Sequence, residues 1–188
     1  PLAVVAGFAA ALLLLFGDAL SSTVERMRLG ELDPSLLASS SRAEAAAEDA
    51  AERAGNDEFY SLHLRDDGYH AEIAAPDSLK IGSWSVTTAD TFVPGAFREW
   101  TDPTFKARDS FFHTGTFVLE EVRWAAIPEV RAEGSRICES RYDAEVDRIS
   151  GIRITSVEGE VRFAFQSALD TGESCSLEFD DEAREIER

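Results

Sequence analysis

The sequence predicts an α+β protein in which a long N-terminal hydrophobic helix is followed by an Ala-rich helix and an antiparallel β-sheet domain. The first seventeen residues carry no charge. A second segment, "SLLASSSRAEAAAEDAAERAG", repeats small apolar residues at helical spacing. From Glu58 onward the apolar period changes to two residues, as in half-buried strands. We therefore expect an N-terminal helix over residues 1–29, a helical segment over residues 30–57 and a β-rich domain over residues 58–188.

The uncharged N-terminal stretch is predicted to form an uncleaved helix. It lacks the basic start of a secretory signal peptide, and seventeen helical residues rise about 26 Å, slightly less than the roughly 30 Å hydrocarbon core of a bilayer. After Asp18 an amphipathic pattern continues to Gly30, where we expect the helix to end. Two interpretations of the helix stay open, a membrane anchor and the packing helix of a filament, and a buried helix of a soluble protein is the less favoured alternative. The apolar residues that would pack in a filament are Leu2, Val5, Phe8, Leu12, Leu15 and Phe16.

The Ala-rich segment is predicted to be a second helix that ends at Gly55. Asp33 is placed to cap its free N–H groups, and Pro34 occupies the first helical position, where a missing donor costs nothing. One face carries a stripe of small apolar residues, which allows close packing against a neighbour. We expect this stripe to pack on the chain's own sheet, with a seam between subunits as the alternative. Its members are Leu36, Ala43, Ala47, Ala50 and Ala54.

Alternating apolar and polar residues predict the strands of the β-rich domain. A first hairpin is expected in "EFYSLHLRDDGYHAEIAA", turning at Asp66, Asp67 and Gly68, and a further strand in "SLKIGSWSVTT". A long loop is expected over residues 92–116. Strands are expected again in "TFVLEEVRW", in a hairpin that turns at Glu158 and Gly159, and in "ESCSLEF". No internal repeat is apparent in the sequence.

The charge balance excludes one class of partner. The chain has 36 Asp and Glu residues against 18 Lys and Arg residues, a formal net charge of -18. Such a chain repels phosphate backbones and anionic lipid head groups. We therefore expect no nucleic-acid partner.

The two cysteines, Cys138 and Cys175, do not form a CxxC pair and have no histidine at metal-binding spacing. A zinc site is therefore not expected. We expect one disulfide that closes a long loop near the C-terminus if the domain lies outside the cytoplasm. Two buried thiols are the alternative for a cytoplasmic protein.

The sequence does not contain the usual signature of an enzyme. No G-x-S-x-G, P-loop or H-E-x-x-H motif occurs. His63 and His70 lie on opposite arms of the first hairpin and alternate with its apolar residues, so they should point away from the core as exposed strand histidines. His113 lies near Asp109 and Ser110, but sequence proximity does not define a triad. We expect a protein that is not an enzyme; the competing hypothesis is an anchored enzyme with a pocket under the aromatic loop.

Calcium is the metal that the sequence favours, although we expect no obligatory cofactor. Carboxylates in "DTGES" and "DDE" place hard oxygen donors on turns near the cysteines, as calcium prefers. The candidate ligands are Asp170, Glu173, Asp180 and Asp181. In so acidic a chain, a solvated acidic surface is the alternative interpretation.

This combination of features resembles the type IV filament superfamily of pilins and pseudopilins. The matching parts are the apolar helix over residues 1–29, the strands from Glu58 onward and the cysteines Cys138 and Cys175. Members usually begin with an aromatic residue and carry glutamate at position five, where this chain has Val5. The resemblance therefore implies an atypical or minor subunit, or one whose start lies upstream.

The function expected from these features is that of a structural subunit of an extracellular or envelope filament. The resemblance implies that the apolar helix lies in the membrane before assembly and then packs against the same helix of other copies. The alternative is a single-pass, membrane-anchored accessory or assembly subunit of a larger membrane complex. In both cases we expect the β-domain outside the cytoplasm.

Overall fold

The computed structural model describes residues 35–74, 80–88, 97–100, 104–107 and 115–187, all within the unit Pro34–Arg188. The expected hydrophobic helix, with its six assembly residues, lies outside the described part of the chain. Most of the expected aromatic loop, including His113, lies outside it as well. Where that region is described the loop prediction is wrong, because Phe97–Trp100 and Thr104–Ala107 are strands that pair with the strand Lys80–Thr88. Among the described residues, no helix is long and apolar enough to span a bilayer.

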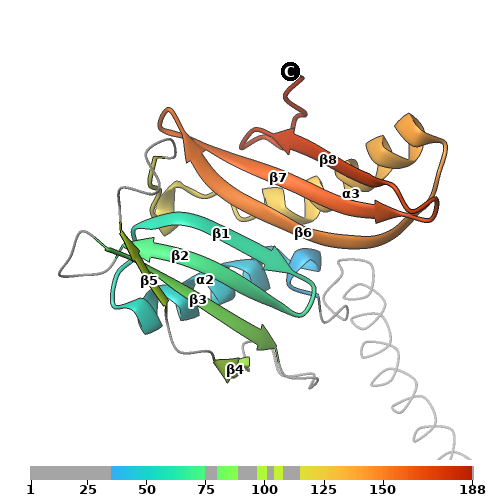
Figure 1. The fold of residues 1–188 in the computed structure, drawn as a ribbon. Coiled ribbons are helices and arrows are strands. Elements are labelled where there is room, and N and C mark those ends of the chain that lie inside the picture. Colours follow the sequence, from blue (N-terminus) through green and yellow to red (C-terminus); the bar gives the residue numbers. More distant parts are fainter. Residues whose placement is uncertain (1–34, 75–79, 89–96, 101–103, 108–114, 188) are drawn as a thin grey trace, which may run out of the picture. The chain divides into compact units, whose positions relative to one another are not determined.

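The described elements follow one order twice, a helix and then three antiparallel strands (Figure 1). The first set is α2 (Ser40–Ala54), β1 (Phe59–Arg65), β2 (Gly68–Ala74) and β3 (Lys80–Thr88). The second set is α3 (Ala126–Tyr142), β6 (Val146–Val157), β7 (Glu160–Leu169) and β8 (Ser174–Phe179). Shorter elements precede or separate them: η1 (Leu36–Ala38), β4 (Phe97–Trp100), β5 (Thr104–Ala107) and η3 (Leu119–Glu121). The fold thus contains a repeated order that the sequence does not reveal.

The two sets meet in the middle of one antiparallel sheet. Six strands lie in the order β3-β2-β1-β6-β7-β8, and β4 and β5 both pair with β3. At the centre, Leu62 of β1 pairs with Ile154 of β6 and Leu64 pairs with Ile152. Each set therefore runs outward from this central pair. The antiparallel sheet and its helices confirm the α+β class.

Both helices pack on the same face of the sheet, where the main core lies (Figure 1). Alternate strand residues, from Leu62 on β1 to Phe163 on β7, are fully buried there. The small-residue face of α2 is buried on this sheet, as the sequence predicts, which confirms that the stripe packs within the chain. Its buried members are Ala43, Ala46, Ala47, Ala50 and Ala54.

The start of the Ala-rich segment differs from the prediction. Ser35 caps η1, its hydroxyl accepting from the backbone N of Leu37 at 3.0 Å and donating to Asp66. Ser39 is extended, with ψ of 129°, so α2 begins only at Ser40. The expected cap Asp33 and Pro34 lie outside the described residues. The end is as predicted, because Gly55 has a left-handed φ of 67° and its N–H bonds the last carbonyls of α2.

The expected strand in "TFVLEEVRW" is wrong. Only Phe117 bridges β1, through two backbone hydrogen bonds of 2.9 Å with Phe59. The chain then turns into η3, where the Glu121 carboxylate accepts from the backbone N of Val118 at 3.0 Å. This local bond competes with strand pairing. The other expected strands and both hairpin turns, at Asp66 and Asp67 and at Glu158 and Gly159, are confirmed.

The sequence pattern does not predict α3. The helix buries a narrow face that consists of Ala126, Ile127, Val130, Gly134 and Cys138. Two of these five residues carry little apolar surface, so the helical period is weak in the sequence. Gly134 lies close to Phe165, because a Cβ at residue 134 would come 2.6 Å from the ring carbon Cγ. The glycine therefore lets α3 approach the sheet.

Candidate functional site

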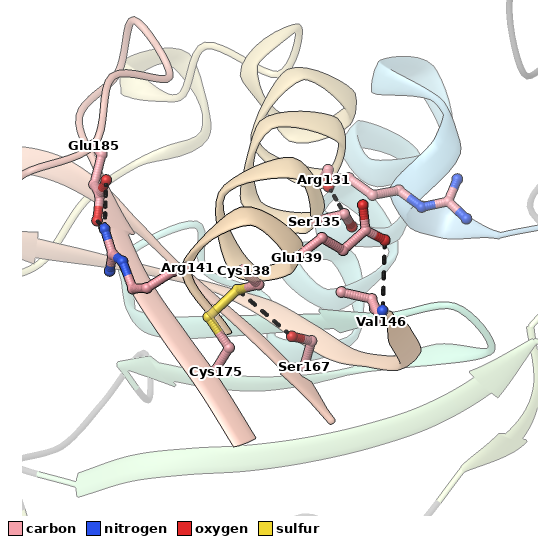
Figure 2. Close-up of a disulfide and its surroundings, with 9 residues drawn as sticks. All are labelled: Arg131, Ser135, Cys138, Glu139, Arg141, Val146, Ser167, Cys175 and Glu185. Carbon is pink, nitrogen blue, oxygen red and sulfur yellow. Dashed lines mark hydrogen bonds and ion pairs between the residues drawn. A yellow bond between two sulfur atoms is a disulfide. The ribbon is translucent and has the colours of Figure 1, made fainter. Parts of the chain in front are cut away.

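Cys138 of α3 and Cys175 of β8 form a disulfide, as the sequence predicts (Figure 2). Their Cα atoms are 6.0 Å apart, and the bridge closes a loop over 37 positions of the sequence. The two residues are 0% and 1% exposed. Ser167 Oγ donates to Cys138 Sγ at 3.8 Å. This buried bond links the helix of the second set directly to the outer strand of the same set.

Polar contacts join α3 to neighbouring segments near the disulfide (Figure 2). Arg141 Nη2 donates to both carboxylate oxygens of Glu185, at 2.8 and 3.1 Å, and so joins α3 to the C-terminal segment. The backbone N of Val146 donates to Glu139 Oε1 at 3.5 Å. The Arg141 side chain is 47% exposed, so this ion pair is weakened by solvent. The disulfide is therefore a stronger link between α3 and its surroundings than this ion pair.

The structure does not bring the four calcium candidates together. Asp170 and Glu173 lie before β8, whereas Asp180 and Asp181 follow it, so the length of the strand separates the two pairs. Asp180 already accepts from the backbone N of Glu182 and from two nitrogens of Arg184, at 2.8–3.0 Å. Partial burial raises the pKa of Asp180, but the bonds from Arg184 outweigh this and hold the pKa below its usual value. No cluster of three metal-ligating side chains occurs among the described residues.

The sheet face opposite the core carries a set of charged and polar side chains in register. We term it the polar face; no described helix packs on it. Arg153, Arg162 and Glu160, which alternate with the apolar residues of their strands, lie there, and so do His63 and His70, which are half-buried rather than exposed. The polar face comprises Ser61, His63, Arg65, His70, Glu72, Ser83, Arg153, Thr155, Glu160, Arg162, Gln166 and Glu178.

Two histidines and an arginine form a row across the centre of the polar face. His63 of β1 pairs in register with His70 of β2 on one side and with Arg153 of β6 on the other. The His63 ring lies over Gly151, where a Cβ would come 2.2 Å from Nε2. Gly151 also has a φ of 151°, a conformation that favours glycine. The glycine thus makes room for the ring.

The surroundings of His63 disfavour a positive charge. Burial, and then the charges of Arg153, Arg65 and His70, lower the pKa of His63 to about 4. Its Nε2 atom is buried and has no hydrogen-bond partner among the described residues. His70 Nε2, in contrast, lies 3.2 Å from Ser83 Oγ. Because cations are repelled here, the histidine pair is better suited to lie near an anionic group than to bind a metal ion.

Two surface grooves lie near the C-terminal segment. One, of about 450 Å³, is lined by residues that include Arg141, Ser176 and Glu185. The other, of about 400 Å³, includes Asp180 and Arg184. Arg141 and Arg184 form ion pairs with Glu185 and Asp180 of the same grooves, and Arg162, which also lines the second groove, forms a longer one with Glu160. In the part of the chain that the structure describes, neither groove places a nucleophile against a histidine base.

Sequence reasoning located the individual members of the polar face but missed their arrangement. Alternation with apolar residues indicated the outward direction of His63 and Arg65 in one strand and of Arg153 in another. That these residues lie together could not be predicted, because the sequence does not show that the two strands are neighbours. Comparison of the chain with protein-family models, with curated proteins and with solved structures gave no match.

Proposed function

We propose that this chain is a non-catalytic structural subunit of an extracellular or envelope filament, assembled through its N-terminal hydrophobic helix. The observation that carries the proposal is the combination of an uncharged seventeen-residue stretch with a disulfide-closed α+β domain. Disulfides persist in oxidising compartments, outside the cytoplasm. The uncharged stretch requires an apolar surrounding, which lipid or the same helix of other copies supplies.

Helix packing supplies the energy of assembly in this proposal. Burial of apolar surface contributes about 25 cal/mol per Å². Leu12, Leu15 and Phe16 carry large apolar side chains that a helix bundle would remove from water. The resemblance to type IV filament subunits supports the same mechanism, because those proteins join an apolar helix to an antiparallel sheet. The acidic domains then face water.

A second function is favoured by the length of the uncharged stretch, which is close to the thickness of a bilayer's hydrocarbon core. In this alternative the chain is a membrane-anchored accessory or assembly subunit of a larger complex. The two functions differ in what contacts the helix. In the filament it is other copies of the chain, and in the membrane complex it is lipid and other subunits.

Electron microscopy of the full chain, purified from its source without detergent, tests the proposal. Filaments of uniform diameter are expected, with the intact N-terminal mass showing that the hydrophobic stretch is retained. Leu12→Lys should abolish the filaments, because it places a charge within the apolar seam. Glu133→Gln, an exposed change on α3, serves as the control and should leave them intact. Detergent-dependent particles that contain other chains would instead establish the accessory subunit.

A further inference from the structure

We propose that the polar face docks a second copy of this chain, which presents the exposed carboxylates Glu44, Glu48 and Glu52 on the outer side of its helix α2. The inference deepens the proposed function, on which it rests, by naming a contact between the folded domains of neighbouring subunits. It concerns the described domain and not the hydrophobic helix. The two contacts can therefore be tested separately.

The basic side of this contact is a diagonal of three arginines. Arg65, Arg153 and Arg162 lie on the adjacent strands β1, β6 and β7. The register pairs Leu64 with Ile152 and Thr155 with Arg162, so each arginine is one same-face step further along the strand direction than the one before. Strand spacing and rise place neighbouring members about 8 Å apart at their Cα atoms. The arginines thus form a line across the middle of the polar face.

The outer arginines of this line are held by the sheet. The Nε atoms of Arg65 and Arg162 are buried without a hydrogen-bond partner in the described part of the chain. The side chains as a whole are 43% and 24% exposed, so they can still be reached from outside. Each forms a long ion pair within the chain, Arg65 with Asp67 at 3.9 Å and Arg162 with Glu160 at 3.7 Å, and neither distance is that of a hydrogen bond. Fixed guanidinium groups lose little entropy when they bind a carboxylate.

Acidic residues border the arginine line, with Asp67 and Glu160 beside its outer arginines and Glu72 and Glu178 on the flanking strands. Glu72 is on β2, where it accepts from Ser61 Oγ at 3.0 Å, and Glu178 is on β8. The three strands between them carry the arginines and His63. The centre of the polar face is therefore basic in a chain whose formal net charge is -18. Such a surface favours an acidic partner.

The acidic side of the contact is a ridge on α2. Glu44, Glu48 and Glu52 are exposed and follow one another at intervals of four, so they lie about 6 Å apart along one side of the helix. The alanines of α2 face the sheet. None of the three carboxylates has an ion-pair partner among the described residues. Three carboxylates in a line thus match three arginines in a line.

A second copy is the occupant that these positions favour. The ridge and the polar face lie on opposite surfaces of the same domain, because α2 covers the other face of the sheet (Figure 1). Docking the ridge of one copy on the polar face of the next is a head-to-tail contact, which repeats without closing when the rotation between copies does not complete a ring. Linear growth is the geometry that a filament requires.

Charge reversal with mixing tests the contact in the full chain, kept in nonionic detergent so that the hydrophobic helix is covered. One variant carries Arg65→Glu, Arg153→Glu and Arg162→Glu; the other carries Glu44→Lys, Glu48→Lys and Glu52→Lys. Sedimentation velocity at low salt should show self-association of the wild-type chain, weakened at least about tenfold in each variant alone. An equimolar mixture of the variants should restore it, because acidic and basic surfaces again face each other. Association should weaken as salt is raised to 1 M.

The control reverses three exposed carboxylates elsewhere, Glu120→Lys, Glu173→Lys and Glu187→Lys, and should associate like wild type. Should the triple arginine variant fail to fold by circular dichroism, the exposed single changes Arg153→Glu and Glu48→Lys give the same mixing test. A wild-type chain that stays monomeric at millimolar concentration, or a mixture that does not recover, overturns the proposal. Filaments that persist with both variants overturn this contact while the proposed function stands. Loss of filaments in Leu12→Lys alone concerns only the hydrophobic helix.

Discussion

The two halves of the sheet share one order of elements but hold their helices on it in different ways. In the second half a covalent bond joins Cys138 of α3 to Cys175 of β8. In the first half the tie is polar: Tyr69 of β2 donates to Asp49 of α2 at 2.5 Å, and Arg53 donates to the same carboxylate at 2.7 Å. Burial and then the Asp49 carboxylate hold the pKa of Tyr69 above its usual value, so the phenol stays a donor.

The difference follows from the faces that the two helices bury. α2 presents five buried alanines, which allow close and continuous contact with the sheet. α3 buries a less regular face, in which Gly134 interrupts the apolar side chains between Val130 and Cys138. The continuous stripe of α2 is joined to the sheet by a polar contact, whereas the interrupted face of α3 is joined to it by a disulfide. The stability of the two halves should therefore change by different amounts when the disulfide or the polar contact is removed.

Removing the disulfide should have the largest effect. The double change Cys138→Ala and Cys175→Ala removes a cross-link that closes a loop over 37 positions. The loop-entropy relation gives a loss of about 3–4 kcal/mol in the free energy of unfolding. Urea denaturation measures this loss. Hydrogen exchange should show that α3 loses protection while α2 keeps it; equal loss in both helices would contradict the division into two differently held halves.

Filling the glycine contact of α3 should rank second. In Gly134→Ala the new methyl group would lie 2.6 Å from Cγ of Phe165, a fully buried ring that cannot move aside freely. Overpacking of this kind costs about 1–3 kcal/mol. Denaturation of Gly134→Ala measures the cost, with Ser135→Ala on the same helix as the control. Adding Phe165→Leu should recover part of the loss of Gly134→Ala, and additive effects would argue against the clash.

Tyr69→Phe tests the polar tie of α2. The change removes one hydrogen bond to a charged group, while Asp49 keeps its bond from Arg53. The expected loss is about 1–2 kcal/mol, less than for the disulfide. A cycle with Asp49→Asn should show coupling between the two positions, whereas Tyr60→Phe offers a comparison on the same sheet. If Tyr69→Phe lowers the free energy of unfolding as much as loss of the disulfide does, the proposed difference between the two halves is wrong.

Local patterns in the sequence were sufficient for much of the fold. Period-two alternation with turn residues at Asp66 and Gly159 located the hairpins, and the alanine stripe located α2. Two cysteines allow only one pairing, so the partners of the disulfide could be predicted without knowledge of the fold. α3 was not predicted, because Gly134 and Cys138 weaken its apolar period. The strand expected near Phe117 does not form, because a local hydrogen bond of Glu121 competes with strand pairing.

The candidate site could be predicted only in part, because it depends on contacts distant in sequence. Alternation placed His63 and Arg153 away from the core, but their adjacency requires the pairing of β1 with β6 across the centre of the sheet. The role of Gly151 could not be predicted for the same reason. Its absent side chain matters only because the His63 ring, from a distant strand, occupies that space.

Acidification should destabilise the half that contains His63. The pKa of His63 is about 4 in the folded state against an ordinary value of 6.5. Between these values the unfolded chain binds the proton more readily, so the free energy of unfolding falls as the pH drops from 6.5 to about 4 and then levels for this group. The groups that face it and oppose its charge are Arg153, Arg65 and His70.

His63→Gln should remove this part of the pH dependence, so wild type should lose more stability than the variant between pH 7.5 and pH 4.5. Urea midpoints across that range measure the difference. Arg153→Gln should raise the pKa of His63 toward its ordinary value by removing the first of the three charges, which proton NMR of the imidazole can follow. An identical pH profile for wild type and His63→Gln would show that the ring titrates normally, and that Gly151 and the neighbouring arginines do not isolate it from water.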